Sequence, residues 1–403
     1  MSYLGELRDN IRPLAAASLG CGTSLPLFAY TNSVFAPHLV REFGWSRAQF
    51  ALVGLTMLTT LIILPFIGRF TDRFGVWRMA LLGTILVPLG FVAFALQTGS
   101  FTYFLLCATA VLAVGSMTGP LVYSRLIAEN FVRAQGLALT VINCAPAVLA
   151  IAIVPLLNWT ILHVGWRLSY LWLGALTLVA GSAALMLIRP GSDARTTAPP
   201  PLQHDARADY AAIFGSKVFW VIIVGLFLCM LQTPLHASQM NIMLLDQGLT
   251  TQTAANIVSV YALGTIVGRI ACGLALDRFA TPIVTSLSMI LPALGFFLLG
   301  TSLDTVAVVT GAMFLVGLSI GAESDLLCYL VARYFKLRIY ASTLGLVHCV
   351  SFLTSATGAA AISLTLKLTD SFAPFLFLVS GTITAGALLF LLLPKSRDFE
   401  KIG

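Results

Sequence analysis

Long apolar stretches dominate the chain and alternate with short polar breaks. A membrane-spanning helix needs about 20 consecutive, mostly apolar residues, and twelve stretches of this sequence meet that requirement. They are residues 13–38, 48–68, 78–97, 101–127, 136–158, 168–188, 217–238, 251–273, 282–301, 305–332, 342–365 and 372–394. The pattern predicts an all-α membrane protein with twelve transmembrane helices.

The composition excludes a water-soluble fold. Hydrophobic residues make up 58% of the 403 residues and charged residues only 10%, whereas soluble domains carry about 25% charged residues. The mean hydropathy is +0.94. So few charges cannot cover the surface of a soluble protein of this size, and disordered and coiled-coil chains would need still more charge.

One long polar segment separates the twelve stretches into two sets of six. It is rich in proline and charge, a composition typical of a linker, with room for one short surface helix. We therefore predict a six-helix bundle at 1–189, a cytoplasmic linker at 190–216 and a second six-helix bundle at 217–403.

The placement of lysine and arginine predicts the orientation in the membrane. If both termini are cytoplasmic, seventeen of the 23 Lys and Arg residues lie on the inner side, and only Arg41, Arg47, Arg167 and Lys367 lie on the outer side. Inner loops carry such an excess of positive charge. We expect a multi-pass protein of the plasma membrane, and among plasma membranes we favour a bacterial inner membrane. The same bias explains the net charge of +7 without a nucleic-acid partner.

An internal repeat relates the two halves. Residues 68–75 (GRFTDRFG) and 273–280 (GLALDRFA) share Gly, Asp, Arg and Phe at an offset of 205 residues, about half the chain. Ser46 and Thr250 occupy matching places before spans two and eight, where each would cap a helix N-terminus. Two pseudo-symmetric bundles in a membrane indicate alternating access to a site between them.

The repeated Asp-Arg pairs predict a cytoplasmic gate. Gly68 would let helices approach closely, and Asp72 would pair with Arg73, Arg78 or neighbouring N–H groups to hold the cytoplasmic side closed in one state. Ordinary anchoring of helix ends is the alternative. The predicted gate comprises Gly68, Asp72, Arg73, Arg78, Asp277 and Arg278.

These motifs carry a family resemblance. Residues 68–78 (GRFTDRFGVWR) resemble the signature loop between helices two and three of the major facilitator superfamily. Residues 42–49 (EFGWSRAQ), 130–139 (NFVRAQGLAL) and 267–278 (VGRIACGLALDR) are similar to its monocarboxylate-porter branch, which includes the bacterial oxalate–formate exchanger. The resemblance covers essentially the whole chain. It implies two six-helix domains around a central cavity, with Arg269 binding a substrate carboxylate.

Three sequence features differ from patterns found in related transporters, and they bear on the predicted proton coupling and substrate. Porters of animal cells have an aspartate for proton coupling where this chain has Thr265, so coupling would fall to another residue. The oxalate exchanger has a lysine where this chain has Ser351, which favours a substrate with one anionic group. Span five lacks the GPxxGG pattern of drug/proton antiporters.

Ionisable residues inside spans mark candidate functional sites, because each costs about 2.5–3.5 kcal/mol to insert. Arg269 lies eight residues before Asp277, about 12 Å inward along the helix and near the middle of the membrane. A guanidinium there suits bidentate capture of a carboxylate. A permanent salt bridge that braces two helices is the alternative.

Two carboxylates on span ten are the proton-coupling candidates. Asp325 lies at a depth similar to that of Arg269 and would pair with it when the site is empty, although a purely structural pair fits equally. Glu323, two residues away, points to the other side of the helix.

Arg125 on span four has three interpretations: a second anion contact, a pair with Glu129, or a side chain that reaches the cytoplasmic surface, which we favour. The other substrate-binding candidates are polar residues within spans, each of which could instead be a packing residue: Asn32, Tyr123, His236, His348 and Ser351.

The sequence predicts a secondary transporter of a small organic monocarboxylate, first of all a proton-coupled symporter. Exchange stays open, and lactate, a short hydroxy acid or an aromatic acid fit alike. The alternative is an exporter of drugs or other hydrophobic compounds. An enzyme is not expected, because HExxH, GxSxG and Walker motifs are missing. We expect no metal or cofactor, and a monomer whose partners are an organic anion, protons and the lipid bilayer.

Overall fold

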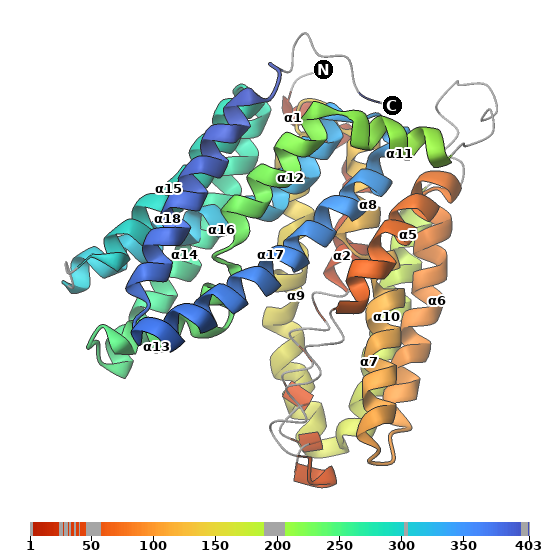
Figure 1. The fold of residues 1–403 in the computed structure, drawn as a ribbon. Helices are drawn as coiled ribbons and strands as arrows, with labels where there is room; N and C mark the ends of the chain where they lie inside the picture. Colours follow the sequence, from red (N-terminus) through yellow and green to blue (C-terminus); the bar gives the residue numbers. More distant parts are fainter. Residues whose placement is uncertain are drawn as a thin grey trace. The chain divides into compact units, whose positions relative to one another are not determined.

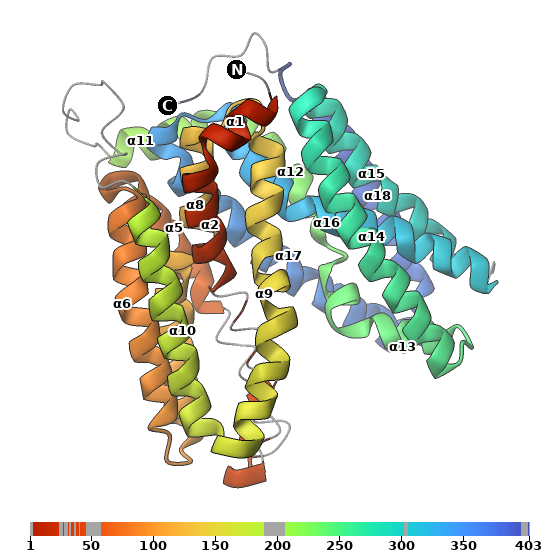
Figure 2. The same ribbon diagram turned by 180° about the vertical axis from the view of Figure 1, so that it is seen from behind.

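The computed structural model describes residues 3–23, 27, 31, 34–35, 38–39, 41–45, 58–188, 206–301, 305–395 and 402. Within these residues the chain is almost entirely helical (Figures 1 and 2), and the β-pairing is one isolated parallel bridge between Phe335 and Ile402. The predicted all-α fold class is confirmed.

The chain divides into two compact units. The first contains residues 1–205 and 337–346, and the second contains residues 206–336 and 347–403. A short segment from the second half of the sequence thus packs within the first unit. The bundle and linker boundaries given above remain predictions.

The helices of the first unit are α1 (Tyr3–Asp9), α2 (Ile11–Gly22), α5 (Leu58–Phe74), α6 (Val76–Ala95), α7 (Phe101–Gly115), the 3-10 turn η2 (Ser116–Thr118), α8 (Pro120–Asn130), α9 (Gln135–Val164) and α10 (Trp166–Leu187). Helix α10 packs against α6, and α2 packs against α9. Stacked aromatic rings fill part of the core: the Tyr170 ring lies 3.8 Å from that of Phe35 and 5.1 Å from that of Phe94, centroid to centroid.

The helices of the second unit are α11 (Ala206–Gly215), α12 (Lys217–Met230), the π-helical turn η4 (Leu235–Gln239), α13 (Met240–Asp246), α14 (Thr251–Arg278), α15 (Thr281–Gly300), α16 (Val306–Tyr334), α18 (Ala373–Leu389) and the 3-10 turn η6 (Phe390–Leu392). The 3-10 turn η5 (Leu337–Ile339) and the first residues of α17 (Tyr340–Thr369) belong to the first unit, and α17 continues in the second. Helix α11 is the short helix expected in the linker. The Thr250 side chain accepts a hydrogen bond from the Thr253 N–H, so this predicted N-cap is confirmed. Ser46 lies outside the described residues.

Nine helices within the described residues are long and apolar enough to cross a membrane, or ten if α11 and α12, bent by 67°, count as one span. Predicted spans 13–38 and 48–68 include residues outside the described part of the chain. Many large apolar side chains are exposed, among them Ile62, Val179 and Met186. A lipid-facing surface accounts for this exposure, because hydrocarbon solvates apolar side chains.

Two predicted spans contain a turn that is not α-helical. Span four, predicted at 101–127, is interrupted by η2, and α8 starts with Pro120. Span seven, predicted at 217–238, leaves the α-helix after Met230, ahead of Pro234. Proline lacks the N–H that a helix interior needs and clashes with the preceding turn, which explains why both breaks occur at these positions.

The N-terminal helix is fastened to the loop between α8 and α9. The Glu6 carboxylate accepts hydrogen bonds from the backbone N–H groups of Val132, Arg133 and Ala134 at 2.8–2.9 Å. These N–H groups belong to the three residues that precede Gln135, the first residue of α9, and Ala134 is the N-cap of that helix. Glu6 therefore closes the N-terminus of α9 from a distant part of the chain.

Candidate functional site

The break in span seven gathers several predicted site residues of the second unit. His236 lies in the π-helical turn, and its Nδ1 is 3.2 Å from Oε1 of Gln232. Ser351 of α17 donates a hydrogen bond to Sδ of Met230, the last residue of α12. π-Helical turns and interrupted helices recur at binding sites in membrane transporters, so this break is where a ligand site is expected.

Glu323 of α16 lies within electrostatic range of two residues near this break. Its carboxylate lies close enough to the Cys229 thiol and the Tyr261 hydroxyl to act on both electrostatically. The Tyr261 ring lies 6.4 Å from the His236 ring, centroid to centroid. Residues from α12, α14 and α16 thus lie within electrostatic range of one another here, and Glu323 is half-buried.

Helices α14 and α16 pack side by side along a row of glycines, which we call the glycine seam (Gly264, Gly268, Gly317 and Gly321). A Cβ on Gly321 would overlap the Thr265 carbonyl oxygen and lie 2.8 Å from the Arg269 backbone nitrogen. A Cβ on Gly268 would likewise overlap the Leu318 carbonyl. The backbones of α14 and α16 therefore touch. This contact holds the Arg269 backbone close to Gly321 of α16.

The two candidate carboxylates of α16 have different surroundings. Asp325 lies four residues after Gly321 on the seam side of the helix, is fully buried, and acts electrostatically on Cys272 of α14. Glu323 is half-buried and acts electrostatically on Cys229 of α12. The two carboxylates thus have different electrostatic neighbours, and their placement on opposite sides of α16 stays a prediction.

Arg269 lies within the apolar stretch Asn256–Arg278 and is half-buried. Tyr261, Thr265 and Arg269 succeed one another at intervals of four residues, so they share one face of α14. Thr265, at the place of the family's aspartate, donates its hydroxyl to the Tyr261 carbonyl at 3.1 Å. The polar face thus runs from the span-seven break toward Arg269.

In the first unit, Asp72 is the centre of a buried hydrogen-bond network. Its carboxylate accepts hydrogen bonds from the N–H groups of Ala341 and Ser342 at 3.0 and 2.7 Å, and from the Ser342 hydroxyl at 2.7 Å. Arg125 forms an ion pair with Asp72 at 2.7 Å. The first N–H groups of α17 have no partner within that helix, so Asp72 caps α17 from α5.

Arg125 is buried, and the favoured prediction that it reaches the cytoplasmic surface is wrong. Its Nε donates to Glu129 at 2.8 Å, and its Nη1 contacts both Asp72 and the Thr71 carbonyl oxygen. The alternative pairing with Glu129 is confirmed. A buried guanidinium needs such partners, because an uncompensated charge away from water is costly.

Asp72 lies beyond the end of predicted span 48–68. Burial has the largest effect on the pKa of its carboxyl. Desolvation raises the pKa of the carboxyl to about 6, although Arg125 and the hydrogen bonds from Ser342 and Ala341 act in the opposite direction. Asp72 therefore titrates closer to neutrality than an ordinary aspartate.

The other residues of the predicted gate differ in their surroundings. Arg73 and Arg78 are exposed, and Arg73 lies over the Phe74 ring at 5.3 Å. The cation paired with Asp72 is thus Arg125, not either of these arginines. Gly68 does permit close approach, since its Cβ would overlap the Ala341 carbonyl oxygen. In the repeat of this motif at residues 273–280, Asp277 acts electrostatically on Tyr329, and Arg278 is exposed.

The remaining predicted binding residues belong to different parts of the chain. Tyr123 is fully buried inside the first unit, against Gly20. His348 is half-buried on α17, three residues before Ser351. Asn32 lies outside the described residues. Groups of three or more potential metal ligands are lacking among the described residues.

Glu6, Ser342, Cys229 and Tyr261 are not among the site residues predicted from the sequence. Tyr261 could have been found, because it precedes Thr265 and Arg269 at helical spacing on the same face. Glu6 and Ser342 carry no comparable signal: their partners lie more than 120 residues away in the chain.

Comparisons with known proteins agree with this architecture. The human monocarboxylate transporter 11 is 26% identical over 414 residues, covering 95% of this chain and 82% of the relative. The Escherichia coli fucose:proton symporter matches in structure with a TM-score of 0.71 at 12% identity, over 97% of this chain and 98% of that chain. A bacterial homologue of the iron transporter ferroportin matches with a TM-score of 0.70 at 13% identity, over 95% and 98% of the two chains.

The family assignment rests on the sequence model of the Major Facilitator Superfamily, which matches residues 18–359. That range contains the Asp72 network, the glycine seam and the span-seven break. The chain therefore belongs to the major facilitator superfamily, a family of multi-pass membrane transporters and not of enzymes.

Proposed function

We propose that the chain transports a small organic monocarboxylate by alternating access, with Arg269 binding the carboxylate. The observation that carries the proposal is a half-buried guanidinium inside the apolar stretch Asn256–Arg278, held by the glycine seam at the end of a polar helix face. A cation placed there at such cost is suited to an anionic ligand. The similarity to human monocarboxylate transporter 11 supports the same substrate class.

The groups near the span-seven break support a substrate with one charged end. His236, Tyr261 and Ser351 offer hydrogen-bonding side chains there, whereas a second cation that would bind a second carboxylate is missing from this set. A dicarboxylate would leave one charge unmatched in a low-dielectric site. Lactate-like and aromatic monocarboxylates both satisfy this chemistry.

Proton coupling, if the transporter is a symporter, falls to Glu323. Thr265 cannot ionise, and Asp325 has no exposed surface. Glu323 keeps part of its surface exposed, whereas Asp325 has none, and this difference favours Glu323 as the group that exchanges a proton. We propose a monomer in a bacterial inner membrane with both termini cytoplasmic.

The test uses the purified full chain. A thermal-shift screen of monocarboxylates and dicarboxylates identifies candidate ligands, and uptake into proteoliposomes is then measured with and without a pH gradient. Wild type should accumulate a monocarboxylate. Arg269→Ala should abolish this uptake, and Arg269→Lys should weaken it severely, because an ammonium cannot form the bidentate contact.

Lys367→Ala is the matched control, since Lys367 is an exposed cation at the end of α17. It should transport like wild type. Normal uptake by Arg269→Ala would remove the site assignment. Transport of hydrophobic compounds that does not depend on Arg269 would instead support a drug exporter.

A further inference from the structure

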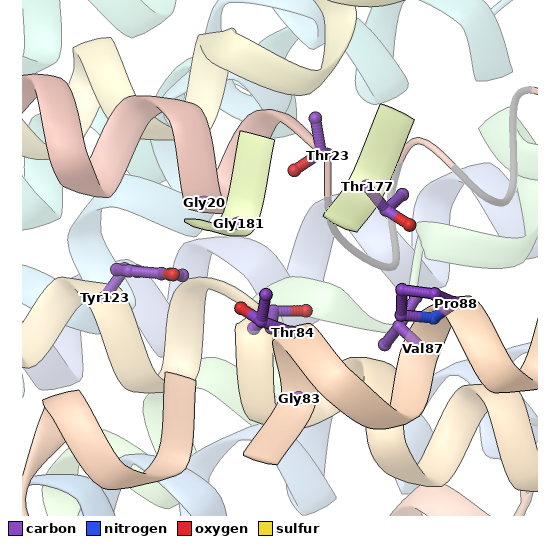
Figure 3. Close-up of a pocket in the computed structure, with 10 residues that line it drawn as sticks. Gly20, Thr23, Gly83, Thr84, Val87, Pro88, Tyr123, Thr177 and Gly181 are labelled. Carbon is purple, nitrogen blue, oxygen red and sulfur yellow. The ribbon is translucent and has the colours of Figure 1, made fainter. Parts of the chain in front are cut away.

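A small cavity lies inside the first unit. Gly20 of α2, Thr84 of α6, Tyr123 of α8 and Gly181 of α10 each contribute to its wall (Figure 3). The space open to the centre of a water molecule is about 10 Å³. Roughly 10–15 Å³ holds one water, so the cavity accommodates a single water and excludes an organic acid.

Two buried hydroxyls in this wall lack hydrogen-bond partners within the described residues. They are Oγ1 of Thr84 and the phenolic oxygen of Tyr123. Thr84 is 4% exposed and Tyr123 is fully buried, and in Figure 3 the hydroxyl end of Tyr123 points toward Thr84. Two unsatisfied donors in one cavity destabilise the fold unless a third group bridges them.

The other hydroxyls of the wall complete a water site. Thr118 donates to the Gly115 carbonyl, and Thr177 donates to the Gly174 carbonyl, so the oxygen of each can still accept a hydrogen bond. A water would accept from Tyr123 and Thr84 and donate to these oxygens. Buried waters make about three such bonds.

We propose that this cavity holds one ordered water that links α6 to α8 behind the break in span four. Thr118 ends the 3-10 turn η2 and Tyr123 lies in the first turns of α8, so the water supports the irregular backbone at that break, as buried waters do in broken membrane helices. The hydroxyl groups carry no charge, which selects water over a cation.

Substitutions that remove one hydroxyl test the proposal, because the sign of the effect differs between a hydrated and a dry cavity. With a bound water, Tyr123→Phe and Thr84→Val should each lower Tm by about 2 to 4 °C. The double variant should lose less than the sum, since the first change already removes the water. In a dry cavity both substitutions would leave Tm unchanged or raise it.

Tyr170→Phe and Thr285→Val are matched controls. The Tyr170 and Thr285 hydroxyls are also buried without partners within the described residues, but they do not line this cavity. Neither control should lower Tm. A fall as large as that of Tyr123→Phe would overturn the proposal, as would a Tm that rises specifically with Na⁺ over choline, which would indicate a cation.

A second measurement needs no variant. Hydroxyl radicals generated by synchrotron radiation form from bound water, so wild-type Tyr123 should be labelled despite its burial, while Tyr170 should not. Equal protection of the two tyrosines would contradict the water site.

Discussion

The Ser342 backbone N–H donates a hydrogen bond to the Asp72 carboxylate at 2.7 Å, across a sequence separation of 270 residues. This contact joins the last turn of α5 to the start of α17 within one compact unit. Gly68 and Gly345 bring the two backbones together, since a Cβ on Gly345 would lie 2.7 Å from the Leu64 carbonyl oxygen. The Asp72 network is thus a helix cap supplied by another helix.

Removal of the Asp72 carboxylate should loosen the start of α17. Asp72→Ala leaves two buried N–H groups without their acceptor and Arg125 with Glu129 as its remaining carboxylate partner, so we expect a loss of about 2 to 4 kcal/mol. Hydrogen exchange of the 337–346 amides should accelerate. Ser342→Ala, which removes one hydroxyl bond, should cost only about 1 kcal/mol; equal effects of the two variants would contradict the capping role.

The same segment should be more firmly held in acid. The pKa of Asp72 is about 6 in its buried place and about 3.9 in water, so the buried state binds the proton more tightly. Its contribution is full below about pH 4 and is lost as pH rises through about 6. Protection of the 341 and 342 amides, corrected for intrinsic exchange, should therefore rise between pH 7.5 and 5.

Asp72→Asn is the control for this titration, because its amide cannot ionise. The pH dependence of these amides should disappear in that variant, and their protection at pH 7.5 should match or exceed that of wild type. A pH dependence that persists in Asp72→Asn would assign the titration to another group.

Substitutions of Glu323 and Asp325, the two carboxylates of α16, should have different effects on proton coupling and on stability. Glu323→Gln should abolish uptake driven by a pH gradient while exchange of labelled for unlabelled substrate continues, because exchange needs no net proton movement. Asp325→Asn should keep gradient-driven uptake and lower Tm, since Asp325 is fully buried. The reverse pattern would assign coupling to Asp325.

The glycine seam should tolerate no side chain. Gly321→Ala places a methyl group against the Thr265 carbonyl and the Arg269 backbone nitrogen, so it should destabilise the protein by about 1 to 3 kcal/mol and reduce uptake by moving Arg269. Gly311→Ala is the control on the same helix, because open space surrounds that position. Alanine there should be neutral or stabilise by up to about 1 kcal/mol. Thermal unfolding and uptake of both variants decide the point.

Some features were predictable because they depend on residues that are neighbours in sequence. The apolar stretches identified the all-α membrane fold, since transfer of about 20 contiguous residues into hydrocarbon is a local property. The motif that contains Gly68 and Asp72 and the N-cap at Thr250 could likewise be identified from short segments of the sequence. The breaks at Pro120 and Pro234 had local signals too, although the predicted spans ran through them.

Tertiary structure alone decided the partners. Asp72 pairs with Arg125 and α17, not with the adjacent Arg73 or Arg78. Asp325 and Glu323 acquire different neighbours, since Asp325 acts on Cys272 of α14 and Glu323 acts on Cys229 of α12 and Tyr261 of α14. The sequence supplies each side chain with its charge and its helix face. The partner of each side chain depends on how helices from distant parts of the chain pack against one another. The free energy of this packing comes from contacts between segments, so no single segment of the sequence reveals it.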